Sequence, residues 1–276
     1  EGIGDWSYAH AIVDVDSDGL NEIAASVDTY GYGRTITKPW LFEYDDGAWP
    51  NEQISDFGDE TAIPQMVAGD VDGDGVYELI RLKALQRVGA HYVETYSVFD
   101  WDGTWVETDI TVAPSNAFPT LGRNGTYAMD TGDPDGDSVD EFVIAFWCDT
   151  DNDGVQEAGD DSVVVRVVDL RGGAWHSEDI AEYPMAGTTG HFGLAVGDAN
   201  NDGQDEIYAA SEEGVIREFA YVGGAWQEGS VPTRFTGHWY NAAMGDVGDD
   251  GTEDLVLVGR SPDGSEFLLA SYSKGG

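Results

Sequence analysis

The stretch Gly69–Leu79, GDVDGDGVYEL, places four carboxylates within nine positions of a short loop. With Asp70 counted as position 1, acidic side chains stand at positions 1, 3, 5 and 9, and Gly75 stands at position 6. Alternate side chains of a tight loop converge on one point, and the glycine permits a sharp turn. Val76, at position 7, can offer its backbone carbonyl. Such a set of hard oxygen ligands favours Ca²⁺, and the alternative is a solvated acidic turn.

The same pattern occurs five times, which indicates a repeat architecture. The first acidic residues of successive loops are 56, 63, 65 and 48 residues apart. The third loop has Ser138 in place of the glycine, the fourth has Asn200 at position 3, and the fifth has Gly248 at position 3. Because the fifth loop lacks one ligand, we expect it to bind calcium most weakly.

Each loop is followed by short runs rich in Val, Ile, Tyr, Phe and Trp, which predict β-strands. A repeat of about 55 residues has room for four strands, the usual content of one propeller blade. Each of the first four repeats also carries a Gly-Trp turn, at Trp49, Trp105, Trp175 and Trp226, and we expect these rings to pack in the core. We therefore predict an all-β fold, a single β-propeller domain over residues 1–276 with five four-stranded blades.

The pattern G-D-x-D-x-D-G-x-x-E followed by an apolar residue resembles the FG-GAP repeats of integrin alpha-subunit β-propellers. It is also similar to the VCBS-type repeats of bacterial and archaeal surface proteins. His191-Phe192-Gly193 comes closest to the Phe-Gly opening of that family, which the other four repeats lack.

In that family the loop joins the first and second strands of a blade and binds Ca²⁺, so the resemblance implies about five Ca²⁺ ions. The implied ligands, with the carbonyl at position 7, are Asp14, Asp16, Asp18, Leu20, Glu22, Asp70, Asp72, Asp74, Val76, Glu78, Asp133, Asp135, Asp137, Val139, Glu141, Asp198, Asn200, Asp202, Gln204, Glu206, Asp246, Asp250, Thr252 and Asp254.

Integrin-type propellers have seven blades, so five motifs imply either a five-bladed ring or part of a larger one. The first residues, Glu1–Trp6, parallel Glu52–Phe57, which follow the tryptophan of the first repeat. We expect residues 1–6 to pair with the fifth blade and to close a five-bladed ring, since closure leaves no exposed sheet edge.

A further acidic loop, Asp149–Asp160, falls out of phase with the five repeats. Acidic residues occupy its positions 1, 3, 5, 9 and 12, and glycine occupies position 6. We predict a sixth Ca²⁺ here, and the alternative is a solvated acidic loop. Its ligands would be Asp149, Asp151, Asp153, Val155, Glu157 and Asp160.

The formal net charge of −42 makes nucleic acid an unfavourable partner, because a phosphate backbone would be repelled. No apolar run is long enough to span a membrane. The acidic excess suits either a very salty environment or an ordinary acidic secreted protein. The single cysteine, Cys148, cannot form an internal disulfide. Calcium loops of this type suit extracellular concentrations, so we predict a secreted or cell-surface protein, alone or as one module of a larger one.

In a four-stranded blade the first-to-second and third-to-fourth loops share one face, and the second-to-third loops and the blade links share the opposite face. Loops carry function on rigid scaffolds, and the second set varies most here. We therefore expect a glycan or protein ligand on the face opposite the calcium loops. The candidate ligand-binding residues are Tyr30, Tyr32, Arg34, Trp40, Arg123, His191, His238 and Trp239.

No nucleophile motif or metal-ligand spacing of histidines is found, which favours a binding module over an enzyme. The alternative is a polysaccharide lyase, because rhamnogalacturonan lyases resemble this chain in carrying calcium-bearing propellers with similar acidic loops. Such an enzyme would need a base, for which His191 or His238 is the candidate.

Overall fold

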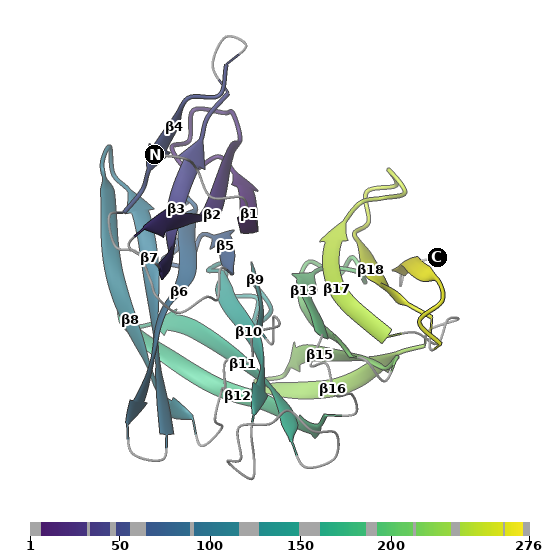
Figure 1. The fold of residues 1–276 in the computed structure, drawn as a ribbon. Helices are drawn as coiled ribbons and strands as arrows, with labels where there is room; N and C mark the ends of the chain where they lie inside the picture. Colours follow the sequence, from purple (N-terminus) through teal and green to yellow (C-terminus); the bar gives the residue numbers. More distant parts are fainter. Residues whose placement is uncertain are drawn as a thin grey trace. The chain divides into compact units, whose positions relative to one another are not determined.

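The computed structural model describes residues 7–31, 34–44, 48–55, 65–88, 91–115, 127–148, 161–185, 192–211, 214–232, 238–261 and 263–272. Within these ranges the regular elements are β-strands, and they form five antiparallel sheets, which we call blades 1 to 5 in chain order (Figure 1). The prediction of an all-β fold is confirmed. The described part of the chain contains no helix that is long and apolar enough to cross a membrane.

Four blades have four strands in simple up-and-down order. Blade 1 contains β1 (Ser7–Val13), β2 (Glu22–Gly31), β3 (Arg34–Phe42) and β4 (Asn51–Gln53). Blade 2 contains β5 (Met66–Gly69), β6 (Glu78–Val88), β7 (His91–Trp101) and β8 (Trp105–Ser115). Blade 3 contains β9 (Tyr127–Gly132), β10 (Glu141–Cys148), β11 (Ser162–Arg171) and β12 (Ala174–Pro184). Blade 4 contains β13 (Phe192–Gly197), β14 (Glu206–Ser211), β15 (Ile216–Val222) and β16 (Ala225–Val231).

Blade 5 has three strands within the described residues: β17 (His238–Gly245), β18 (Asp254–Arg260) and β19 (Phe267–Tyr272). The expected fourth strand, residues 1–6, lies outside the described residues. The chain divides into two compact units, Glu1–Asn116 with Leu170–His176 and Ala117–Asp169 with Ser177–Gly276.

The hydrophobic core lies between neighbouring blades within each unit. Blade 1 and blade 2 share a buried cluster that includes Val15, Leu79 and Phe99. In blade 4, Leu194 joins a cluster with blade 3, whereas its neighbour Ala195 joins a different cluster with blade 5. Successive side chains of a strand point to opposite faces, so a blade buried on both faces reads as a continuous apolar run.

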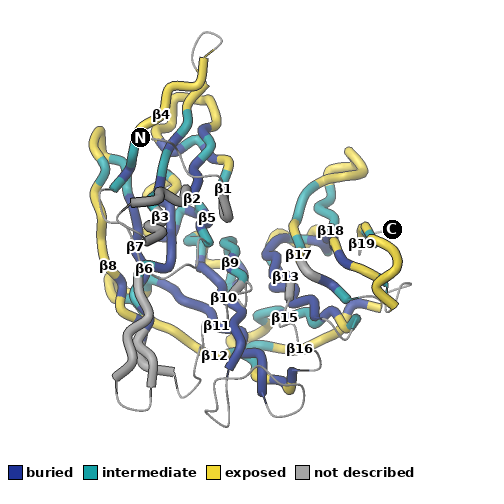
Figure 2. Tube along the Cα trace, viewed as in Figure 1, coloured by how far each residue is buried: buried dark blue, intermediate teal, exposed yellow. Residues whose placement is uncertain are grey.

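Burial falls from the inner strands of a blade toward its outer strand. Every residue of β10 is buried, whereas most residues of the outer strands β12 and β16 are exposed. Figure 2 shows this contrast, with β10 in dark blue and much of β12 and β16 in yellow. The buried inner strands therefore provide a rigid support for the loops that follow them.

Glycines on the inner strands allow close approach between blades. A Cβ added to Gly132, at the end of β9, would stand 2.6 Å from Val196 Cγ1 on β13. A Cβ added to Gly193 would stand 2.6 Å from the backbone nitrogen of Ala242 on β17. The glycine before the third acidic loop is thus required by blade packing.

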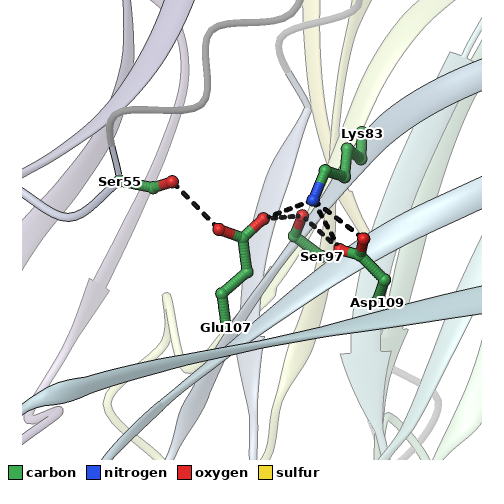
Figure 3. A network of polar contacts seen from close by, with 5 residues as sticks. All are labelled: Ser55, Lys83, Ser97, Glu107 and Asp109. Carbon is green, nitrogen blue, oxygen red and sulfur yellow. Dashed lines mark hydrogen bonds and ion pairs between the residues drawn. The ribbon is translucent and has the colours of Figure 1, made fainter.

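A polar network ties blade 1 to the outer strands of blade 2 (Figure 3). Lys83 Nζ lies 2.8 Å from Glu107 Oε1 and 2.7 Å from Asp109 Oδ1. Glu107 Oε1 also accepts a hydrogen bond from Ser97, and Glu107 Oε2 accepts one from Ser55, which follows β4 of blade 1. The lysine is largely buried and holds two partly exposed carboxylates. We therefore interpret this network as a structural ion pair rather than a reactive centre.

Candidate functional site

All five acidic repeat loops connect the first and second strands of a blade, as the family resemblance implies. Position 1 directly follows the first strand, and position 9 is the first residue of the second strand, in every blade. The strands that carry the loop ends are hydrogen-bonded to each other, as in the pairing of Gly132 with Glu141. Each loop is therefore an eight-residue connection of fixed span, and position 9 opens the second strand.

The five loops share the same internal hydrogen bonds. The backbone N–H at position 6 donates to the position 1 carboxylate at 2.8–3.0 Å in all five. The N–H at position 7 donates to the position 5 carboxylate at 2.8–3.1 Å in all five. These bonds fix the aspartates at positions 1 and 5 from behind and leave their remaining lone pairs for another partner.

The loop backbone is left-handed at two positions. Position 6 has φ between 73° and 91° in all five loops, including Ser138 of the third. Position 4 is also left-handed, at Ser17, Gly73, Gly136, Asn201 and Asp249. The four non-glycine residues with positive φ in the described chain all belong to these loops. Unfavourable backbone conformations of this kind persist where the surrounding structure, or a ligand, demands them.

Loops 1 to 3 bring carboxylate oxygens together. Three such oxygens lie within 4.8 Å of one another in each loop, and they come from Asp14, Asp16 and Asp18, from Asp70, Asp72 and Glu78, and from Asp133, Asp135 and Glu141. Clustered acidic groups alone do not make a metal site, since exposed ones are common without an ion.

A second observation in loops 2 and 3 points to a cation. Glu78 is 1% exposed and Glu141 is 2% exposed. Glu78 Oε2 accepts the N–H of Val71, but the buried Oε1 has no hydrogen-bond donor within the described chain, and neither has Oε2 of Glu141. A buried carboxylate oxygen without a donor is costly unless a cation faces it.

The pKa values of Glu78 and Glu141 are raised for the same reason, an excess of negative charge in a buried place. Burial, followed by the charges of Asp72 and Asp70, raises the pKa of Glu78 to about 8. Burial, followed by the three aspartates of its own loop, raises the pKa of Glu141 to about 9. Position 2 of that loop is Pro134, which has no N–H to stabilise the carboxylate. A divalent cation would supply the missing positive charge.

Loops 4 and 5, although fully described, do not gather three carboxylate oxygens in this way. In loop 4 the Asn200 amide donates to Glu206, and the buried Asn200 Oδ1 has no donor among the residues that the structure describes. In loop 5 position 3 is Gly248, and Asp254 accepts the N–H groups of Val247 and Gly248 instead. The expectation that loop 5 binds calcium most weakly stays a prediction.

Sequence reasoning missed a contact that joins consecutive loops. Asp205, at position 8 of loop 4, accepts the N–H of Asp133, position 1 of loop 3, at 2.9 Å. Glu253, at position 8 of loop 5, accepts the N–H of Asp198, position 1 of loop 4, at 3.0 Å. Position 8 therefore links the loops of blades 3, 4 and 5. An acidic residue at position 8 was the signal available in the sequence.

Most of the predicted ligand-binding residues lie wholly or partly outside the described residues. Tyr32, Arg123, His191 and the whole loop Asp149–Asp160 lie outside the described residues. Tyr30 and Arg34 lie in β2 and β3, but their side chains also lie outside the description.

The other three candidates are described. Trp40 and His238 are half-buried. Trp239 is 0% exposed and packs in the core between blades 4 and 5. The strand alternation of β17 turns the Trp239 ring inward, so we correct its assignment from ligand binding to core packing.

Within a blade, the Gly-Trp turn lies at the same end as the acidic loop and carries a pair of aromatic rings in blades 1, 2 and 4. Ring centroids lie 5.1 Å apart in Tyr44–Trp49 of blade 1 and in Trp101–Trp105 of blade 2, and 5.0 Å apart in Tyr221–Trp226 of blade 4. Trp105 and Trp226 are partly buried against the inter-blade cores, whereas Trp49 is 50% exposed. The expected core packing therefore holds in part, and each pair also offers ring surface to solvent.

Comparison with known proteins identifies the fold. No family model matches the sequence, and no curated protein matches it. Among solved structures, a fungal lectin from Aleuria aurantia, described as a six-bladed β-propeller with a novel fucose recognition mode, matches with a TM-score of 0.50 and 14% identity. That match covers 99% of this chain and 77% of the lectin. An arginine-to-alanine triple mutant of AofleA from Arthrobotrys oligospora matches with a TM-score of 0.52 and 12% identity, over 96% of this chain and 70% of its own. The chain is thus a β-propeller, as its repeats predict.

Proposed function

We propose that this chain is a calcium-stabilised, extracellular β-propeller module that binds a glycan. The observation that carries the calcium part is the buried Glu78 carboxylate, whose Oε1 lacks a donor and whose group lies among Asp70 and Asp72. An oxygen-only donor set with a backbone carbonyl at position 7 suits Ca²⁺ better than a transition metal, which would favour His or Cys ligands.

Calcium at these loops would act on the stability of the blades. Position 9 begins the second strand of each blade, so the same glutamate belongs to the metal loop and to the sheet. Without a cation, the carboxylates of a loop repel one another and resist burial. Ions that bind only the folded state stabilise it by mass action. The resemblance to FG-GAP and VCBS-type repeats supports this proposal.

Glycan binding is supported by the fold and by the surface of the calcium-loop face. The β-propeller that matches this chain over 99% of its length is a fungal lectin with a fucose recognition mode. The aromatic pairs at the Gly-Trp turns provide ring surface of the kind that stacks against sugars. A ligand on the opposite face stays a prediction, since most candidate residues there lie outside the described chain.

Two measurements test this proposal separately. Native mass spectrometry with and without a chelator counts the bound ions, and we expect five, or six if the loop Asp149–Asp160 also binds. A count of none or one refutes the calcium part. A glycan array probed with the labelled protein in calcium tests the ligand, and we expect binding to a defined subset of sugars. A protein that binds none of the glycans but retains calcium would be a propeller for a protein ligand instead.

A further inference from the structure

A cavity of about 260 Å³ lies beside the first calcium loop, between blades 1 and 2. Three separate segments form its walls: the β1–β2 loop, the β3–β4 connection and the β7–β8 turn. The lining residues are Val15, Asp16, Glu22, Leu41, Glu43, Pro50, Asn51, Glu52, Trp101 and Trp105. All of them belong to one compact unit.

The size of the cavity limits its ligand. Sites for drug-sized ligands span roughly 300–1,000 Å³. A cavity of about 260 Å³ is just below that range and suits one small ring rather than a peptide or an extended cofactor. Exposed residues from Pro50 to Glu52 form part of the lining, so a longer molecule can leave the cavity toward solvent.

The lining combines aromatic surface with acceptors. The Trp101 and Trp105 rings are tilted by 60° with centroids 5.1 Å apart, so they pack on each other and do not form an open cage for a cation. Trp105 Nε1 donates to Glu52 Oε1 at 2.7 Å, which fixes both side chains. Glu43 and Asn51 add an exposed carboxylate and an exposed amide.

The charge of the cavity selects against anions. Four carboxylates line it, and among the described residues no lysine, arginine or histidine does. Carboxylates accept hydrogen bonds from hydroxyl groups, and an indole ring packs against the C–H groups of a sugar ring. Even with a Ca²⁺ ion held by Asp16 and Glu22, the carboxylates of Glu43 and Glu52 remain in the lining, so a negatively charged sugar such as a uronate would meet like charge there.

We propose that this cavity binds one neutral monosaccharide unit of a glycan. The Trp101–Trp105 pair would contact the apolar side of the sugar ring, while Glu43, Asn51 and Glu52 would take its hydroxyl groups. This assignment rests on the proposed glycan-binding function and adds its place, which is the calcium-loop face, and its class of ligand. Asp16 and Glu22 belong both to the first acidic loop and to the cavity wall. A change in the conformation of that loop would therefore change the shape of the cavity.

The nine tryptophans allow a direct test, because each indole N–H gives one signal in an NMR spectrum of the ¹⁵N-labelled protein. Trp101→Phe and Trp105→Phe identify two of the signals. The protein in calcium is titrated with the methyl glycosides of L-fucose, D-galactose, D-glucose, D-mannose and N-acetylglucosamine, and with glucuronate. A single buried ring is expected to bind with a Kd on the order of 1 mM.

We expect at least one neutral glycoside to shift the Trp101 and Trp105 signals, and glucuronate to leave them in place. Asn51→Phe, which fills the cavity from an exposed position, should weaken that binding at least 10-fold. Gln227→Phe, on the exposed outer strand β16 of blade 4, is the matched control and should change it less than twofold.

The possible results separate this inference from the proposed function. If a sugar binds but shifts only other tryptophan signals, or if Asn51→Phe has no effect, the cavity is not the site although the glycan function stands. If glucuronate binds better than every neutral sugar, the assignment of a neutral ligand is overturned. If neither the titration nor the array detects any sugar, the glycan function itself is refuted.

Discussion

Glu78→Gln should stabilise the protein in a chelator and should lose most of that gain in calcium. Gln keeps the size of Glu and can still accept the N–H of Val71, which Glu78 Oε2 accepts at 2.9 Å. It removes the charge. The substitution therefore isolates the charge of this buried group from its packing.

The magnitude without calcium follows from the pKa of Glu78. Burial, with the charges of Asp72 and Asp70, raises this pKa from 4.5 to about 8. A raised folded-state pKa means that the stability due to the protonated form is fully present below pH 4.5 and is lost as the pH rises toward 8. At pH 7 the loss amounts to about 3 kcal/mol, at 1.36 kcal/mol per unit. Gln cannot ionise, so in a chelator the variant should be more stable than the parent by about that amount.

In calcium most of this gain should disappear. The variant lacks one anionic ligand, and a 100-fold weaker affinity at saturating calcium would remove about 2.7 kcal/mol of stabilisation. Urea unfolding followed by circular dichroism, in about 1 mM calcium and in a chelator, measures both values. Glu178→Gln, on the exposed part of β12, is the control and should have little effect in either condition. A Glu78→Gln variant whose stability relative to the parent is the same in calcium and in chelator would refute the metal assignment of loop 2.

Three further variants test separate features of the structure. Burial, assisted by the charges of Asp205 and Glu253, raises the pKa of Asp130 from 3.8 to about 6. Asp130→Asn should therefore increase the free energy of unfolding by roughly 2–3 kcal/mol above pH 6 and leave it unchanged below pH 4. Unfolding measured across this pH range tests the prediction. Ser138→Gly relieves a left-handed serine with φ of 73° and should stabilise the protein by about 0.5–1 kcal/mol, whereas an unchanged melting temperature would mean that loop 3 bears no strain. Lys83→Met leaves two carboxylates without their cation and should cost about 1–3 kcal/mol at pH 7. Burial alone would raise the pKa of Glu107, but hydrogen bonds from Lys83, Ser97 and Ser55 lower it overall. The ionised carboxylate therefore stabilises the folded protein above pH 4.5, and the cost of removing Lys83 should shrink as the pH falls below that value. A cost independent of pH would place the role of Lys83 in packing.

The sequence predicts the parts of this structure that depend on short-range spacing. The five acidic loops, the glycine at position 6 in four of them and their place before an apolar strand all follow from counting along the chain. The left-handed position 4 is less visible, since Ser17, Gly73 and Asn201 share no side-chain chemistry, although Gly and Asn are the residues that tolerate this conformation.

Features that join distant segments could not be predicted. The cavity beside loop 1 needs three segments whose proximity depends on how blade 1 packs on blade 2. Trp239 and its neighbour His238 point to opposite sides of β17, and the sequence alone does not show which side faces the core. The contact of Asp205 with loop 3 depends on the distance between blades, which the glycines at the ends of inner strands set.

The position 8 contacts would give calcium, if it binds as proposed, a role beyond each single loop. In loop 4, Glu206 begins β14 while the adjacent Asp205 holds the first residue of loop 3, and Gln204 donates to the carbonyl of Pro134 in that same loop at 2.6 Å. Consecutive residues of one loop therefore belong to the proposed metal site, to the sheet and to the contact with the neighbouring blade. An ion that orders loop 4 would also fix the contact to loop 3. Metal binding at neighbouring loops of blades 3, 4 and 5 is then expected to be cooperative, since two sites that order the same segment share the entropic cost of ordering it.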